Sequence, residues 1–243
     1  RRATTLEKLV TIEGTLTFPK PPAAILDITG TAEVRELKLM QGKAVAKGVL
    51  HALCVWRAEG DAALLSQTAE LPFNQIVDVE GLSEDCRCLC VLEPVGFAAA
   101  EGETAEDGSA STTLTATALL RLNGWRPYQL QCVADAFSTR FAAEVTPQTL
   151  AVEALLCTLD ETTVLRGSGP LPDAGARILA CFASFGPVSL IRDERGEGRA
   201  ALTARAVVSA FAENTLGEIE CYEKVLDYAL PLPADLPPEA EAY

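Results

Sequence analysis

The sequence contains little of what enzymes most often use for chemistry. Its 243 residues include a single histidine, and aromatic residues make up only 6%. A Ser-His-Asp or Cys-His arrangement needs a histidine base, so only His51 is available for that role. Apolar residues still reach 49%, which is enough for a core built mainly from small and branched side chains.

Positive charge is scarce as well. The chain has 20 Lys and Arg against 34 Asp and Glu, which gives a formal net charge of −14. Nucleic-acid binding needs a basic surface that neutralises phosphates, so we expect no nucleic-acid partner. The same charge disfavours anionic membranes. It keeps a protein soluble through self-repulsion and permits a basic protein partner.

Long apolar runs and phosphate-binding loops are also missing. No apolar run reaches the roughly 18 residues that a membrane-spanning helix needs, so we expect no membrane span. The residues from Arg1 to Val10 lack the apolar segment of a signal peptide, so we expect a reducing compartment. The scattered glycines are not followed by the Lys and Ser/Thr of a phosphate loop, and we expect no cofactor.

Eight cysteines are present, and we expect buried free thiols rather than disulfides. Cys86, Cys88 and Cys90 alternate, so a strand would place their side chains on one sheet face. Their spacing is not that of a zinc site. The other five lie in apolar, strand-like segments, where a free thiol behaves as a small hydrophobe: Cys54, Cys132, Cys157, Cys181 and Cys221. A metal site and late oxidative cross-linking are the alternatives.

Alternation of apolar and polar residues dominates the chain. From Thr113 to Leu122, leucine and alanine alternate with mostly polar residues, which predicts a half-buried antiparallel strand. The run from Lys43 to Trp56 is apolar on both faces beyond Lys47, and we expect it to be covered on both sides. Gln41-Gly42 before this run predicts a hairpin turn. Prolines near both ends of the chain disfavour helices there.

Three motifs occur twice, in the same order. Gly14 to Pro19 is repeated as Gly167 to Pro172, 153 residues later. The other two repeats follow at offsets of 156 and 159 residues: Gly42-Lys43-Ala44-Val45 with Gly198-Arg199-Ala200-Ala201, and Leu71-Pro72-Phe73 with Leu230-Pro231-Leu232. A period of this length is that of a domain, not of a solenoid repeat.

The repeat and the alternation together predict an all-β protein made of two related tandem modules, each a β-sandwich or barrel-like unit. We expect the first module at residues 1–158 and the second at residues 159–243. The second module is either cut short or completed by the stretch from Val133 to Leu156.

Two polar features are candidates for function. His51 lies in an apolar run and has an aliphatic counterpart near Val207, so we interpret it as a core or edge residue rather than a catalytic base. The densest polar cluster comprises Asp135, Ser138, Thr139 and Arg140. It is interpreted either as a strand end with a hydrogen-bonded turn or as a docking edge for a protein partner.

Five stretches together resemble the SPOCS domain of clostridial spore proteins: Gly14 to Pro19, Ile25-Leu26, Gly42 to Val45, Leu71 to Gly81 and Val133 to Phe141. The strings Leu-Pro-Phe with Val-Asp-Val-x-Gly, and Asp-Ala-Phe-Ser-Thr, are the most specific parts. The resemblance covers about Val10 to Leu156 and the first half of the second copy.

The resemblance implies a non-enzymatic scaffold or adaptor of spore coat assembly. Such a protein would bind spore coat morphogenetic proteins in the mother-cell cytoplasm, at the forespore or spore coat surface. It implies no catalytic, cofactor or metal-binding residues. The alternative is a carbohydrate- or peptidoglycan-binding β module, which would need exposed aromatic side chains. Trp56, one of two tryptophans, lies in an expected core strand and disfavours this alternative.

Overall fold

The structure is a computed structural model that describes most of the chain. The described residues are 2–100, 102–106, 108–126, 129, 131, 133, 135, 137, 139–142, 144, 146, 148–149, 164–170, 175–192 and 200–232. The strands are β1 (Arg2–Phe18), β2 (Pro22–Met40), β3 (Lys43–Ala58), β4 (Leu64–Asp78), β5 (Arg87–Ala99), β6 (Glu103–Thr104), β7 (Ala110–Trp125), β8 (Arg177–Phe185), β9 (Ser189–Arg192), β10 (Ala200–Glu213) and β11 (Ile219–Pro231). No helix occurs among these residues, and the all-β prediction is confirmed.

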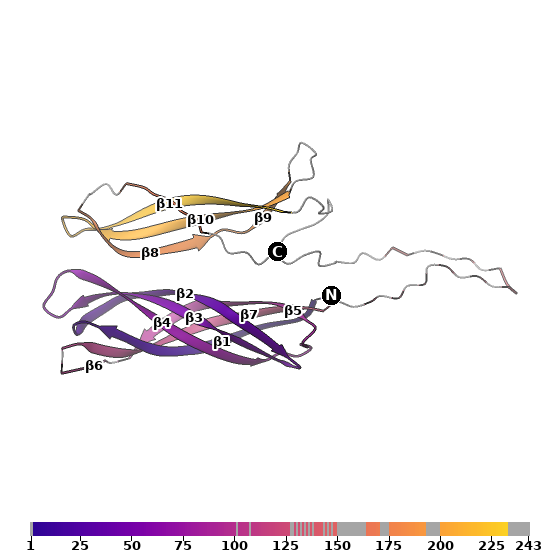
Figure 1. Cartoon of the computed structure of the whole chain (residues 1–243), viewed down its shortest axis with the longest axis horizontal. Coiled ribbons are helices and arrows are strands. Elements are labelled where there is room, and N and C mark those ends of the chain that lie inside the picture. The colour runs from indigo at the N-terminus through magenta and orange to yellow at the C-terminus, as the bar shows by residue number, and fades with distance from the viewer. Residues whose placement is uncertain are drawn as a thin grey trace. The chain divides into compact units, whose positions relative to one another are not determined.

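The strands form three sheets, which can be followed in Figure 1. One has the order β1-β7-β5, with β6 also paired to β7. A second has the order β2-β3-β4. The third has the order β11-β10-β8, with β9 also paired to β10. The pairings of β7 and of β10 with their neighbours are antiparallel.

Contacts divide the chain into two units that interleave in sequence. Unit 1 comprises Arg1–Pro19, Thr29–Ala52 and Thr68–Asp160, and unit 2 comprises Lys20–Ile28, Leu53–Gln67 and Glu161–Tyr243. Three strands, β2, β3 and β4, therefore contribute residues to both units.

Alternate side chains of β7 form one side of the core of unit 1. Leu114, Leu120 and Leu122 are fully buried, whereas Thr113 and Arg121 on the opposite face are exposed. The half-buried strand predicted from the alternation is confirmed. On the adjacent strand β1, Leu16 and Phe18 are also fully buried, because the register keeps even-numbered residues of both strands on one face.

The prediction that β3 is covered on both faces beyond Lys47 is wrong for most of the second face. Its even-numbered residues from Ala44 to Ala58 are almost all buried. On the opposite face Val49 is buried, but His51, Leu53 and Val55 are only half-buried. Packing of one sheet on another covers a single face of each sheet, so an apolar run alone does not establish a second cover.

Two glycines let the strands of unit 1 approach closely. A Cβ added to Gly14 of β1 would lie 2.7 Å from the Leu71 side chain of β4. A Cβ added to Gly48 of β3 would lie 2.6 Å from the Phe73 ring and would also meet the backbone carbonyl of Glu33. Leu71 and Phe73 of the Leu71-Pro72-Phe73 motif therefore pack against glycines of the neighbouring strands, where a larger residue would clash with them.

The two copies of the repeat share a strand order. In the first copy, β3 lies between β2 and β4. In the second copy, β10 is the central strand: β8 and β9 pair with one of its edges, and β11 pairs with the other. The copies also differ, because a Cβ on Gly167 would meet Leu226 and not Leu230, the counterpart of Leu71. That the chain consists of two related tandem modules stays a prediction.

We expect the Gly48→Ala substitution to reduce the free energy of unfolding by about 2–3 kcal/mol, because overpacking costs this much where backbone blocks the added methyl group. Gly96→Ala is the matched control, since a Cβ there meets nothing within 4 Å. The control should change stability by less than about 1 kcal/mol. Urea unfolding of both variants provides the test, and equal losses would contradict the assigned close approach.

Candidate protein-binding site

The structure places the predicted polar cluster outside the strands. Asp135, Thr139 and Arg140 are exposed and belong to no strand, and Ser138 lies outside the described residues. The nearest preceding strand, β7, ends at Trp125. Whether the cluster is a strand end with a turn or a docking edge stays a prediction.

The same segment exposes large apolar side chains, which were not predicted from the sequence. Val133 is 87% exposed, Phe137 89% and Phe141 77%. The available signal was the alternation of these residues with Asp135 and Thr139. An exposed phenylalanine ring contributes to the free energy of binding when a partner protein buries it. We therefore define the candidate site as the described residues between Val133 and Phe141.

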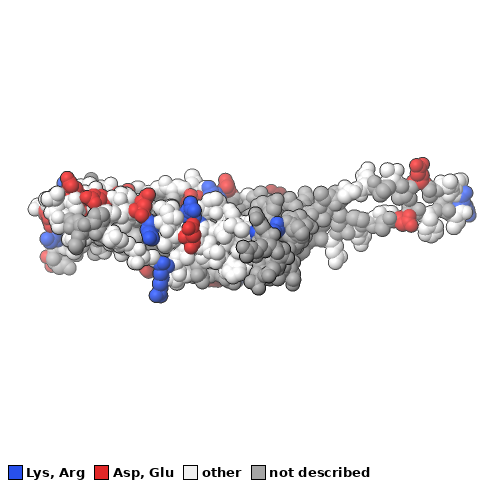
Figure 2. Space-filling view, turned by 90° about the horizontal axis from the view of Figure 1, so that it is seen from above, with Lys and Arg blue, Asp and Glu red and all other residues white. Residues whose placement is uncertain are grey.

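Charged side chains on the described surface are mixed in sign. Figure 2 shows acidic and basic groups interspersed on the visible face, without a large basic patch. Many are engaged in exposed ion pairs, such as Lys47 with Glu36 at 3.1 Å and Arg205 with Asp227 at 3.1 Å. Such pairs each contribute little stability.

Four cysteines follow the sequence prediction in part. Cys54 and Cys86 are buried, and Cys88 and Cys90 are half-buried on the inward face of β5. All four are free thiols. Cys132 and Cys157 lie outside the described residues.

The expectation of burial is wrong for Cys181 and Cys221, which are free but exposed. They lie on strands β8 and β11, which flank β10. Cys181 pairs with Ala210 and Cys221 with Phe211, and these consecutive residues of β10 point to opposite faces. The two thiols are therefore on opposite faces of one sheet and do not face each other.

Burial suppresses ionisation of the inward thiols. It raises the pKa of Cys54, Cys88 and Cys90 from 9.0 to about 11. The Asp27 carboxylate adds to the effect at Cys54, and the neighbouring thiols of Cys86 and Cys90 add to it at Cys88. The three thiols with a raised pKa are protonated at neutral pH. Since the thiolate is the nucleophile and the metal ligand, this environment favours a structural role.

His51 projects from the half-buried face of β3, not into the core. Its Nδ1 lies 3.6 Å from Glu70 Oε1, and its Nε2 lies 4.0 Å from Glu33 Oε2. The side chain thus lies on the half-buried face of the central strand β3, between Glu33 of β2 and Glu70 of β4, and is neither a core nor an edge residue. Among the described residues, no group of three His, Cys, Asp or Glu side chains is arranged to hold a metal ion.

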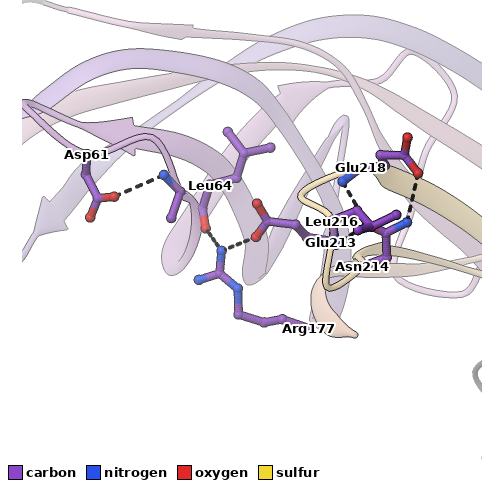
Figure 3. Close-up of polar contacts among 8 residues, drawn as sticks. Asp61, Leu64, Arg177, Glu213, Asn214, Leu216 and Glu218 are labelled. Carbon is purple, nitrogen blue, oxygen red and sulfur yellow. Dashed lines mark hydrogen bonds and ion pairs between the residues drawn. The ribbon is translucent and has the colours of Figure 1, made fainter. Parts of the chain in front are cut away.

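Figure 3 shows a second polar cluster, within unit 2, around Arg177 and Asn214. Its hydrogen bonds stabilise the local strand ends and turn. Arg177 donates hydrogen bonds to the carbonyl oxygen of Leu64 and, at 2.5 Å, to Glu213 Oε2. Asn214 Oδ1 accepts the backbone N–H groups of Leu216 and Glu218 at 2.9 Å each. These contacts close the β10–β11 hairpin and leave Arg177 fully engaged.

The comparisons with known proteins agree with the resemblance. Residues 23–95 match the family model described as SipL, SPOCS domain. The match spans β2, β3 and β4 and reaches into β5. No curated protein and no solved structure matches the chain. The resemblance to the SPOCS domain of SipL is thereby confirmed for this part of the chain.

The matched region contains the most specific motif, and its residues have packing roles. Leu71 is fully buried against Gly14, and Phe73 is buried over Gly48. Val77 and Val79 of the following Val-Asp-Val string are also buried. The motif thus fixes the fold of the module. Among the described residues, no helix has the length and apolar character needed to cross a membrane.

We expect alkylation to separate the two kinds of thiol. Burial and a pKa of about 11 keep Cys54, Cys88 and Cys90 protonated at pH 8, so they should react at least about tenfold more slowly than the exposed Cys181 and Cys221.

Mass spectrometry of peptides after timed exposure to a maleimide measures the separate rates. Labelling in denaturant is the control, because unfolding should make all the cysteines react alike. Fast labelling of Cys88 or Cys90 in the native protein would contradict the inward placement.

Proposed function

We propose that this protein is a non-enzymatic scaffold or adaptor in spore coat assembly. It would bind spore coat morphogenetic proteins in the mother-cell cytoplasm, at the surface of the forespore or the spore coat. The observation that carries this proposal is the match of residues 23–95 to the SPOCS domain of SipL, which supports a sporulation-related role.

The segment from Val133 to Phe141 is the proposed contact with the partner. It combines large exposed apolar side chains with Asp135 and Arg140. Aromatic anchors surrounded by polar groups are typical of residues that dominate binding energy. The polar groups would set the register of the partner, and Phe137 would supply buried area.

The acidic charge of the chain supports a partner with a basic surface. A net charge of −14 raises the rate of encounter with such a protein, and salt screens this attraction. Raised ionic strength is therefore expected to slow association more than it accelerates dissociation.

The chemistry of the described residues favours binding over catalysis. The inward thiols are protonated at neutral pH, and His51 lies among surface carboxylates. The carbohydrate-binding alternative is less well supported, because Trp56 is fully buried and Trp125 is partly buried. Sugar-binding faces use exposed aromatic rings, which these tryptophans do not provide; the exposed rings of the described residues are phenylalanines, such as Phe137 and Phe141, which we assign to the protein contact.

The proposal predicts that the immobilised full chain captures coat morphogenetic proteins from sporulating cells. The Phe137→Ala substitution and the double substitution Asp135→Ala with Arg140→Ala should each weaken this binding about tenfold or more, as is typical of central interface residues. Thermal unfolding should be nearly unchanged, because these side chains are exposed.

A second double variant, Glu144→Ala with Arg166→Ala, is the matched control, since it removes one charge of each sign at exposed positions outside the candidate site. It should bind normally. Normal binding by the Asp135 and Arg140 variant would place the contact elsewhere. If mass spectrometry identifies no coat protein with the unmodified chain, the scaffold proposal fails.

A further inference from the structure

Strand β5 presents an open edge. It ends the sheet β1-β7-β5, and its outer side has no strand partner among the described residues. At the opposite edge, Gln75 Nε2 of β4 donates a hydrogen bond to the Thr11 carbonyl of β1 at 3.1 Å, so one backbone acceptor of β1 is already engaged. Unpaired backbone groups along an edge strand are ready to pair with another chain.

The side chains on this edge are unusually apolar for an exposed strand. On the outward face of β5, Leu89 is 52% exposed and Val91 46% exposed. Edge strands commonly carry charged residues that oppose pairing. Here charge is confined to the two ends of the segment, at Arg87 and Glu93.

We propose that β5 pairs with β5 of a second copy of this chain, antiparallel and about a two-fold axis at Cys90. In this register Arg87 lies opposite Glu93 of the second copy, and Leu89 lies opposite Val91 of the second copy. The symmetry generates both contacts twice. A continuous sheet through the two copies results, with the apolar pairs on its outer face.

The sequence of β5 selects this register. Outward residues must face outward residues, so the alternative axes lie at Leu89 or Val91. An axis at Leu89 would set Arg87 against Val91, and an axis at Val91 would set Leu89 against Glu93. Only the axis at Cys90 pairs opposite charges with each other and apolar residues with each other.

In the single chain, the charges beside β5 are not balanced. Arg121 contacts two carboxylates, at 2.7 Å from Glu93 and 3.3 Å from Glu7. One positive charge therefore serves two negative charges. Arg87 has no ion-pair partner among the described residues, and Arg87 of the second copy would balance this cluster.

The length of the pairing is limited by the strand itself. Pro94 has no N–H to donate, and the ladder between β5 and β7 shifts between Pro94 and Gly96. The pairing therefore covers residues 87–93. Because the contact is two-fold, both β5 edges are used in it and the contact closes as a dimer.

Sedimentation velocity of the full chain over a series of concentrations tests this proposal, which does not rest on the proposed function. The unmodified protein should form a dimer. Arg87→Glu should raise the dimer dissociation constant about tenfold or more, because two attractive pairs become repulsive. Glu93→Arg should act likewise.

Charge exchange identifies the register. Mixing the Arg87→Glu and Glu93→Arg proteins should restore dimers, and the double variant carrying both changes should dimerise alone. Lys8→Glu on β1 is the control, since it makes the same charge change on the other edge strand and should leave dimers intact.

Three outcomes would overturn the proposal: an unmodified chain that stays monomeric at every concentration, a control as disruptive as Arg87→Glu, or a mixture that does not recover. Binding of coat proteins is a separate readout, so loss of the dimer with normal capture would leave the scaffold proposal standing.

Discussion

The close packing of small residues against the Leu71-Pro72-Phe73 motif is the constraint on which unit 1 depends. Gly14 and Gly48 leave space that the Leu71 side chain and the Phe73 ring occupy, and a methyl group at either glycine would have to displace them. Since cores are packed at near-crystalline density, this fit fixes the mutual position of β1, β3 and β4. The exposed edge of β5 and the segment that follows β7 are displayed by that framework.

The alternation of apolar and polar residues predicted which side chains share a face of a strand. It did not predict whether that face is buried. It predicted the alternating burial of β7 and the shared face of Cys88 and Cys90, because period-two geometry is local. It failed for Cys181 and for the second face of β3. Whether a sheet face is covered depends on another layer, and that information is absent from the strand's own residues.

The sequence predicted which segment contains the candidate site, but it did not predict which of its side chains are exposed. The Asp-Ala-Phe-Ser-Thr string drew attention to Asp135 and Arg140, and both are exposed. The exposure of Phe137 was not predicted, because a phenylalanine in an alternating pattern usually faces a core. His51 was placed in a strand correctly, but its orientation toward Glu33 and Glu70 depends on the neighbouring strands.

The interleaving of the two units limits how the chain can be divided. Residues 20–28 and 53–67 group with the β8–β11 sheet, although they belong to strands that begin or end in unit 1. A fragment cut near residue 160 would therefore separate the later sheet from segments that belong to its own unit. The boundaries between the two copies of the sequence repeat therefore differ from the boundaries between the two units of the folded chain.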